Sequence, residues 1–157
     1  MKLTALAVRE RLADLGLDSF AMLTGGKGVH VVLPFTPRGD WDEVRAFAQG
    51  FCTRLAREQP DLFTVAIAKA SRRGRIFLDY LRNQRSATAI LPYSARVRPG
   101  GPVAAPVGWD ELPAMDSPAA FTLADAALLL KRARSKELKG WGMADQPLPR
   151  AETVASR

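Results

Sequence analysis

The chain has 157 residues, of which 47% are hydrophobic and 25% charged, and its formal net charge is +7 at pH 7. This is the balance of one globular domain, and no apolar run approaches the roughly 18–20 residues that would span a bilayer. The single cysteine, Cys52, excludes a disulfide framework and a cysteine metal site and favours a reducing cytoplasm. The positive charge favours polyanionic partners.

The first third of the chain carries the strongest secondary-structure signals. Apolar spacing predicts a helix over residues 3–15. The segment VHVVLPF, residues 29–35, is typical of a buried strand that ends at a proline. Asp40 and Glu43 form a capping-box pattern, and the apolar spacing that follows predicts a helix over residues 41–57.

The rest of the chain is less regular. The apolar residues 63–70 fit either a helix or a strand, while residues 73–81 and 88–93 alternate well enough to predict two strands. Proline and glycine are frequent over residues 98–121, which predicts a largely extended connection there.

Thr122 can cap a predicted helix from Leu123 to Arg134, and residues 138–157 are predicted to be a flexible tail. There is no internal repeat. The elements together predict an α/β (α+β) domain without the regular βαβ alternation of a doubly wound fold.

A glycine-rich loop precedes the strand predicted at residues 29–35. Its three glycines, among them Gly26, permit backbone conformations that turn amides toward an anion. Lys27 adds a positive charge, Thr24 a hydroxyl donor, and His30, the only histidine, a ring donor. The spacing is not that of a Walker A loop, and the loop precedes a strand instead of opening a helix. The alternative is a plain hairpin turn with His30 as an ordinary strand residue.

Most of the excess charge lies between residues 72 and 98, where seven arginines and one acid give a net charge of +6. The acid is Asp79, in a predicted apolar strand, where a carboxylate must be paired or bind a metal ion. Pairing with a nearby arginine and ligation of Mg²⁺ or Mn²⁺ both stay open. Arg96 and Arg98 would share one face of an extended segment, either as a phosphate clamp or as a solvated pair.

Three stretches together resemble one family. They are TGGKGVHVVLPF, WDEVRAFAQGFCTRLAREQPDLFT and RRGRIFLDYLRNQRSATAILPYSARVRPGGPVAAPVGWDEL. Over about residues 5–134 the chain resembles the polymerase domain of bacterial DNA ligase D, a member of the archaeo-eukaryotic primase superfamily that serves non-homologous end joining. The resemblance implies a primase-polymerase-like mixed sheet with flanking helices. It also implies a metal-dependent nucleotidyltransferase that adds nucleotides, often ribonucleotides, at DNA ends.

The resemblance also implies roles for particular residues. The family's serine-containing glycine loop contacts the triphosphate of the incoming nucleotide, and its positions correspond to Thr24, Gly26, Lys27 and His30. The third metal carboxylate of the family, a catalytic residue, corresponds to Asp79, with Mg²⁺ or Mn²⁺ as cofactor. The phosphate-binding arginines correspond to Arg82, Arg96 and Arg98.

One departure from the family affects catalysis. Its Asp-x-Asp motif supplies two metal ligands and is expected upstream of the helix at residues 3–15. Asp14 and Asp18 lie four residues apart, so they do not form this motif. We therefore expect residues 1–137 to be the C-terminal portion of such a domain, incomplete at the N-terminus and inactive alone.

The resemblance implies DNA ends, a nucleoside triphosphate and the end-binding Ku protein as partners, together with a companion chain that carries the missing motif. It implies no membrane partner and a location in the bacterial cytoplasm, at the nucleoid. The alternatives are a non-catalytic accessory module that binds DNA ends or nucleotides, and the remnant of a split gene.

Overall fold

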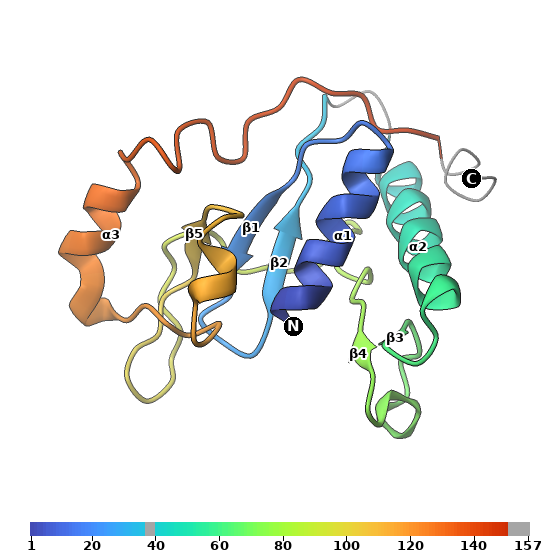
Figure 1. The fold of residues 1–157 in the computed structure, drawn as a ribbon, viewed down its shortest axis with the longest axis horizontal. Coiled ribbons are helices and arrows are strands. Elements are labelled where there is room, and N and C mark those ends of the chain that lie inside the picture. Colours follow the sequence, from blue (N-terminus) through green and yellow to red (C-terminus); the bar gives the residue numbers. More distant parts are fainter. Residues whose placement is uncertain (37–39, 151–157) are drawn as a thin grey trace. The chain divides into compact units, whose positions relative to one another are not determined.

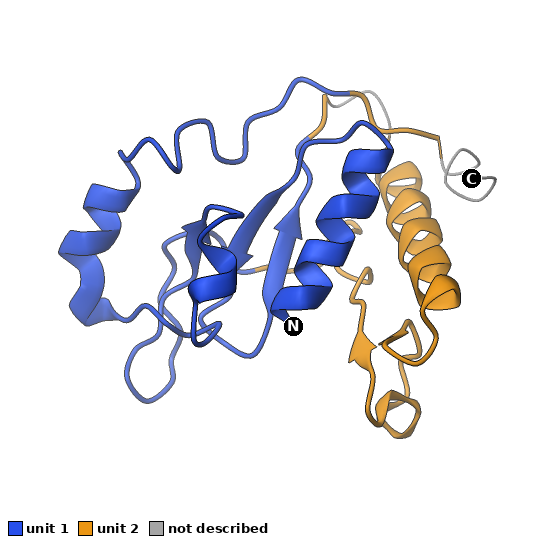
Figure 2. Ribbon diagram, in the orientation of Figure 1, with its two compact units in different colours: residues 1–34, 90–146 blue, residues 35–89, 147–157 orange. Residues whose placement is uncertain are grey.

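The computed structural model describes residues 1–36 and 40–150 (Figure 1). The chain divides into two compact units. Unit 1 consists of residues 1–34 and 90–146, and unit 2 of residues 35–89 and 147–157 (Figure 2). Each unit has its own helices and its own small sheet. None of the helices in the described residues has the length and apolarity needed to cross a membrane.

Unit 1 is built on a three-stranded antiparallel sheet with the strand order β2-β1-β5. Strand β1 (Phe20–Leu23) lies in the centre, between β2 (Val29–Val32) and β5 (Ala105–Val107). Pro106 in β5 lacks an amide donor, which an edge strand tolerates. The sheet therefore joins the first part of unit 1 to the second.

Helix α1 (Lys2–Asp14) packs against β2, and the ammonium group of Lys2 donates to the carbonyls of Pro113 and Met115 at 2.7 and 2.8 Å. These contacts hold the start of α1 at the short 3₁₀ helix η2 (Leu112–Ala114). The core cluster of unit 1 comprises Ala5, Ala21, Leu23, Val103, Ala105, Val107, Leu112, Phe121 and Leu129.

The C-terminal helical segment of unit 1 starts with a 3₁₀ turn, η3 (Leu123–Asp125), and continues as α3 (Ala126–Arg132). Thr122 and Asp125 form a capping box, in which the Asp125 carboxylate accepts from the Thr122 amide at 2.8 Å. The predicted cap at Thr122 is confirmed, and the predicted helix forms from Leu123 to Arg132, two residues shorter than predicted and with a 3₁₀ first turn.

Unit 2 contains α2 (Trp41–Glu58), whose Asp40–Glu43 capping box is confirmed. The chain continues through β3 (Phe63–Thr64), the 3₁₀ helix η1 (Lys69–Arg72) and β4 (Ile76–Phe77), and β3 pairs with β4 in parallel. The ambiguous segment at residues 63–70 thus divides into a short strand and the start of a 3₁₀ helix.

The mixed α/β fold class is confirmed, but one predicted strand is much shorter, another does not form, and a predicted connection contains a strand. The strand predicted over residues 73–81 is formed only at Ile76–Phe77, and the chain turns a few residues later, from Leu81 on. No strand forms over residues 88–93, where Tyr93 has a φ of 65°. Conversely, the predicted connection at residues 98–121 contains β5, whose small apolar residues are completely buried.

The segment from residue 138 to Gln146 is held by contacts with unit 1 and is not a free tail. The indole of Trp141 donates to the carbonyl of Ala21 at 3.0 Å, and Gln146 is buried. The Gln146 amide group bonds both the amide and the carbonyl of Asp18 and donates to the carbonyl of Pro34. Satisfying a buried amide in this way fixes the segment to unit 1. The predicted tail beyond residue 150 lies outside the described residues.

Candidate functional site

The glycine loop connects β1 to β2 as a hairpin and is closed by Thr24. The Thr24 hydroxyl donates to the Gly28 carbonyl at 2.7 Å and accepts from the Gly28 amide at 3.3 Å. The Thr24 amide donates to the same carbonyl at 3.2 Å. Because a hydroxyl has one proton to donate, the structure uses it inside the loop, where the sequence predicted a donor to a ligand.

Gly25 is held against the chain beneath it. Its φ is +63°, its amide donates to the carbonyl of Pro118 at 2.9 Å, and a Cβ would lie 3.0 Å from the carbonyl carbon of Val103. Both the left-handed backbone and the close approach to a neighbouring main chain require glycine here. The loop is therefore fixed by residues that follow it far along the sequence.

Arg96 holds the loop from another direction. Its Nε donates to the carbonyl of Thr24 at 2.6 Å, and its guanidinium lies beside Gly26, where a Cβ would be 3.7 Å from Cζ. In the described residues the two terminal amino groups of Arg96 donate to no protein acceptor. Arg96 therefore fixes the loop with one donor and retains others for a ligand.

The tip of the loop presents donors outward. Lys27 is exposed, and in the part of the chain that the structure describes the amides of Gly26 and Lys27 donate to no protein acceptor. Successive amides in such a turn, next to a lysine and an arginine, are suited to an anion. The hairpin turn and the anion site are therefore compatible readings of the same loop.

His30 lies in β2, half-buried and opposite Met22. Its neighbours Val29 and Val31 pack against the core cluster, so the imidazole points to the other face of the sheet. His30 is thus a strand residue on the arm of the hairpin that begins at the glycine loop.

The chain between Arg96 and Arg98 is not extended, which was the basis for expecting both arginines on one face. The Arg98 amide donates to the Arg96 carbonyl at 2.8 Å, which closes a tight turn around Val97. Arg98 is exposed, whereas Arg96 is half-buried against the loop. The two arginines therefore have different tasks, and only Arg96 holds the loop.

Asp79 and Arg82 lie in unit 2, in a turn that follows β4. One carboxylate oxygen of Asp79 accepts from the Leu81 amide at 3.1 Å, and the other is 3.7 Å from Nε of Arg82. Arg82 also donates to the carbonyl of Thr88 at 2.7 Å. The open alternative of a pair between Asp79 and a neighbouring arginine is therefore realised, in a turn and not on a strand.

Asp79 also acts on a neighbouring thiol. Burial, and after it the negative charge of Asp79, raise the pKa of Cys52 to about 12. The thiol is therefore neutral at ordinary pH and has no reactive thiolate character.

The described residues do not form a complete magnesium or manganese site. No group of three or more His, Cys, Asp or Glu side chains in these ranges could hold a metal ion. The sequence does contain one Asp-x-Asp, Asp40-Trp41-Asp42, but the Asp40 carboxylate caps α2 by accepting from backbone amides of its first turn. Asp79 alone does not provide a divalent-metal site.

The structure thus brings some predicted residues together within each unit. Arg96 lies against Thr24 and Gly26 in unit 1, and Asp79 lies beside Arg82 in unit 2. Sequence reasoning missed Pro118, which contributes through its backbone carbonyl and so leaves no side-chain signal. The role of Gly25 could have been predicted from the sequence, because tight loops often require glycine.

The fold and the glycine loop define a mixed α/β domain that presents amides and cations at a hairpin. The family model of the LigD primase-polymerase domain matches residues 1–137. The multifunctional non-homologous end joining protein LigD of Pseudomonas aeruginosa is 46% identical over 101 residues. A LigD protein of Mycobacterium tuberculosis strain H37Rv, a multifunctional non-homologous end joining DNA repair protein, is 37% identical over 144 residues.

A solved structure of the polymerase domain from Mycobacterium tuberculosis ligase D in complex with DNA has a TM-score of 0.75 and 36% sequence identity to this chain. The match covers 88% of this chain and 47% of the chain of the solved domain. The two curated relatives are matched over 64% and 92% of this chain, but over only 12% and 19% of their own lengths. The chain belongs to the LigD primase-polymerase domain family.

Proposed function

We propose that this chain is the part of a ligase D primase-polymerase domain that binds the nucleotide triphosphate and DNA phosphates, in a nucleotidyltransferase that repairs DNA ends by non-homologous end joining. The glycine loop carries this proposal, because Arg96 holds it and the outward amides of Gly26 and Lys27 suit a polyphosphate. A solved relative, the polymerase domain from Mycobacterium tuberculosis ligase D, is in complex with DNA, which supports DNA as a partner.

In this proposal the residues act by positioning and charge, which dominate phosphoryl transfer. Lys27 supplies a positive charge at the loop tip, and the terminal amino groups of Arg96 supply a fork that matches phosphate oxygens. His30 donates from its ring beside the loop, and Arg98 and Arg82 contact DNA or nucleotide phosphates. Thr24 keeps the loop closed while these groups bind.

Nucleotide addition in this family would require Mg²⁺ or Mn²⁺, which neutralises charge on the reacting phosphates. Asp79 is the one carboxylate of this chain that we assign to such a site. Since the described residues do not complete it, we propose that a companion chain supplies the remaining carboxylates. We assign no catalytic step to these residues alone, and Ku stays a proposed partner.

Nucleotide binding is tested by fluorescence anisotropy with a labelled nucleoside triphosphate. Lys27→Ala is expected to weaken binding about tenfold or more, because a hydrogen bond to a charged group contributes about 1.5–3 kcal/mol. Lys139→Ala, which removes the same charge from another exposed position of unit 1, is the matched control. Equal affinities of the two variants would refute the assignment of the loop.

A second candidate function is a non-catalytic accessory module that binds DNA ends, which the pairing of Asp79 with Arg82 favours. Extension of a primed DNA end with Mn²⁺ separates the two functions. Addition that is lost in Asp79→Ala supports the polymerase. The accessory module is supported if DNA binding falls steeply with salt and does not depend on metal. In that case no nucleotide addition should occur, even when a complementary polymerase segment is present.

A further inference from the structure

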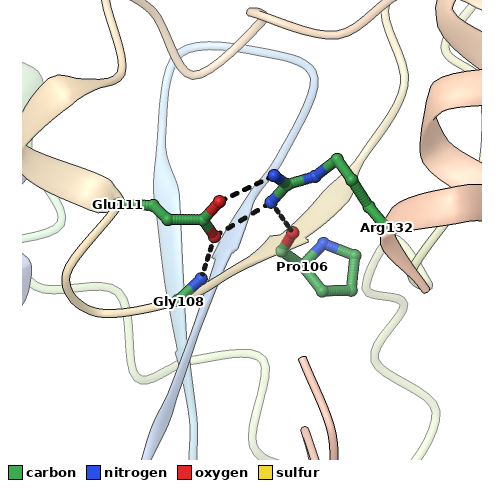
Figure 3. Close-up of polar contacts among 4 residues, drawn as sticks. All are labelled: Pro106, Gly108, Glu111 and Arg132. Carbon is green, nitrogen blue, oxygen red and sulfur yellow. Dashed lines mark hydrogen bonds and ion pairs between the residues drawn. The ribbon is translucent and has the colours of Figure 1, made fainter. Parts of the chain in front are cut away.

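Helix α3 has an inner face that anchors it to unit 1. Leu129 is 5% exposed and belongs to the core cluster. Three residues on, Arg132 forms a bidentate ion pair with Glu111, with its two terminal nitrogens 2.7 and 3.0 Å from the carboxylate oxygens (Figure 3). The Arg132 guanidinium also lies 5.1 Å from the centre of the Phe121 ring. Apolar burial and a paired charge therefore fix α3 on this side.

The anchor persists at neutral pH because the Glu111 carboxylate is well supported. Arg132, and to a lesser degree the Gly108 amide that donates to it at 2.7 Å, lower the pKa of Glu111 (Figure 3). The carboxylate thus stays charged, and the ion pair holds α3 in one orientation. A fixed inner face means that the outer face is presented in a defined geometry.

The outer face of α3 combines an apolar side chain with positive charges. Ala127, Leu130 and Lys131 lie on the helix, Arg134 lies in the turn that follows it, and all four are exposed. Leu130 is 67% exposed. An open hollow of about 550 Å³ is lined by Leu130, Lys131, Arg134 and Ser135, which we call the α3 outer face.

Positive charge dominates this region, although an acid flanks it at each end, Asp125 and Glu137. Between these two acids lie four cations, of which, within the described residues, Arg132 alone is neutralised by an ion pair. Two further leucines, Leu123 and Leu128, are 60% and 48% exposed nearby along the chain. Exposed leucines between lysines and arginines suit a partner that offers apolar groups and carboxylates together.

We propose that the α3 outer face is a docking surface for an acidic amphipathic helix of a partner protein. Carboxylates of such a helix would pair with Lys131 and Arg134, while its apolar stripe would cover Leu130. Charge complementarity alone would also suit a DNA backbone, but phosphates make no use of an exposed leucine. The surface shares no residue with the glycine loop, so it adds a partner to the proposed function and does not depend on it.

The test uses the full chain and two labelled synthetic peptides of about 16 residues, long enough for four helical turns. One places leucines at helical spacing among glutamates, and the other has the same composition with the leucines dispersed. Fluorescence anisotropy in moderate salt should give about tenfold tighter binding for the first peptide. Leu130→Ser, and separately Lys131→Glu combined with Arg134→Glu, should each weaken that binding about tenfold.

Leu3→Ser is the matched control, because Leu3 is 82% exposed on α1 of the same unit and should leave the peptide affinity unchanged. All substituted side chains are exposed, so circular dichroism should show unchanged unfolding. Equal binding of the two peptides would overturn the proposal, as would an unchanged affinity in Leu130→Ser. The α3 outer face would be assigned to DNA if a duplex oligonucleotide bound tightly and displaced the peptide, and if Leu130→Ser left the affinity for the oligonucleotide unchanged.

Discussion

The glycine loop of unit 1 and the Asp79 turn of unit 2 differ in what holds their polar groups. The loop is held by groups distant in sequence: Arg96 is 72 residues from Thr24, and the Pro118 carbonyl accepts from Gly25. Asp79 is held by its immediate neighbours, the Leu81 amide and Arg82. One site is part of the tertiary structure, and the other is a local turn.

This difference has a functional meaning. Donors that the fold has already oriented bind an anion without reorganisation, which is the arrangement that favours binding and catalysis. The carboxylate of Asp79 is 43% exposed and 3.7 Å from its partner, and such surface pairs contribute about 0–1 kcal/mol. The loop is therefore prepared for its ligand, while Asp79 can exchange Arg82 for another cation at little cost.

The largest expected effect comes from Gly25→Ala, which tests whether the loop is fixed from beneath. The left-handed backbone alone costs alanine about 1–2 kcal/mol, and the contact with Val103 should add about 1–3 kcal/mol. Gly16→Ala is the control, because Gly16 has a φ of +73° with nothing within 4 Å of its Cβ position. Urea unfolding measures both, and equal losses would show that the loop is not held against Val103.

The next effect separates the two arginines. Arg96→Lys keeps the charge but loses the Nε donor to Thr24, so triphosphate affinity should fall about tenfold, as expected for a charged hydrogen bond of about 1.5–3 kcal/mol. Arg98→Lys, at an exposed position without a contact to the loop, should change affinity less than about twofold. Calorimetric titration distinguishes them. Equal losses in both variants would mean that Arg96 acts only by charge.

A smaller effect is expected from Thr24→Val, which keeps the shape of a buried side chain but removes its hydroxyl. The Gly28 amide would lose its acceptor, and unfolding free energy should fall by about 1 kcal/mol. Thr24→Ser retains the hydroxyl and should stay within about 0.5 kcal/mol of the parent. A neutral Thr24→Val in urea unfolding would show that the hydroxyl does not close the loop.

The helices could be predicted because their signals are local. The Asp40–Glu43 and Thr122–Asp125 capping boxes lie within four residues of sequence, and apolar spacing gives the rest. Strand β5 could not be predicted in this way, because its small apolar residues follow a proline- and glycine-rich stretch. They adopt strand geometry by pairing with β1. Strand preference depends on such tertiary partners.

The candidate site divides in the same way. The loop was visible as a glycine motif, but its contacts with Arg96 and Pro118 depend on how distant segments meet. The turn at Asp79 was missed because alternation through residues 76–81 resembles a strand. An aspartate side chain that accepts from the amide two residues on competes with strand pairing, and here it prevails.

The smallest effect is expected from Asp79→Asn, because a local, exposed carboxylate should matter little to stability. Unfolding free energy should change by less than about 0.5 kcal/mol, as for other surface pairs. Since the charge of Asp79 is the second cause of the raised pKa of Cys52, its removal should lower that pKa from about 12, while burial keeps it above 9.0. The pH dependence of iodoacetamide alkylation should therefore shift to lower pH. An unshifted profile would show that Asp79 does not act on the thiol, and a large loss of stability would show that its turn is held as firmly as the glycine loop.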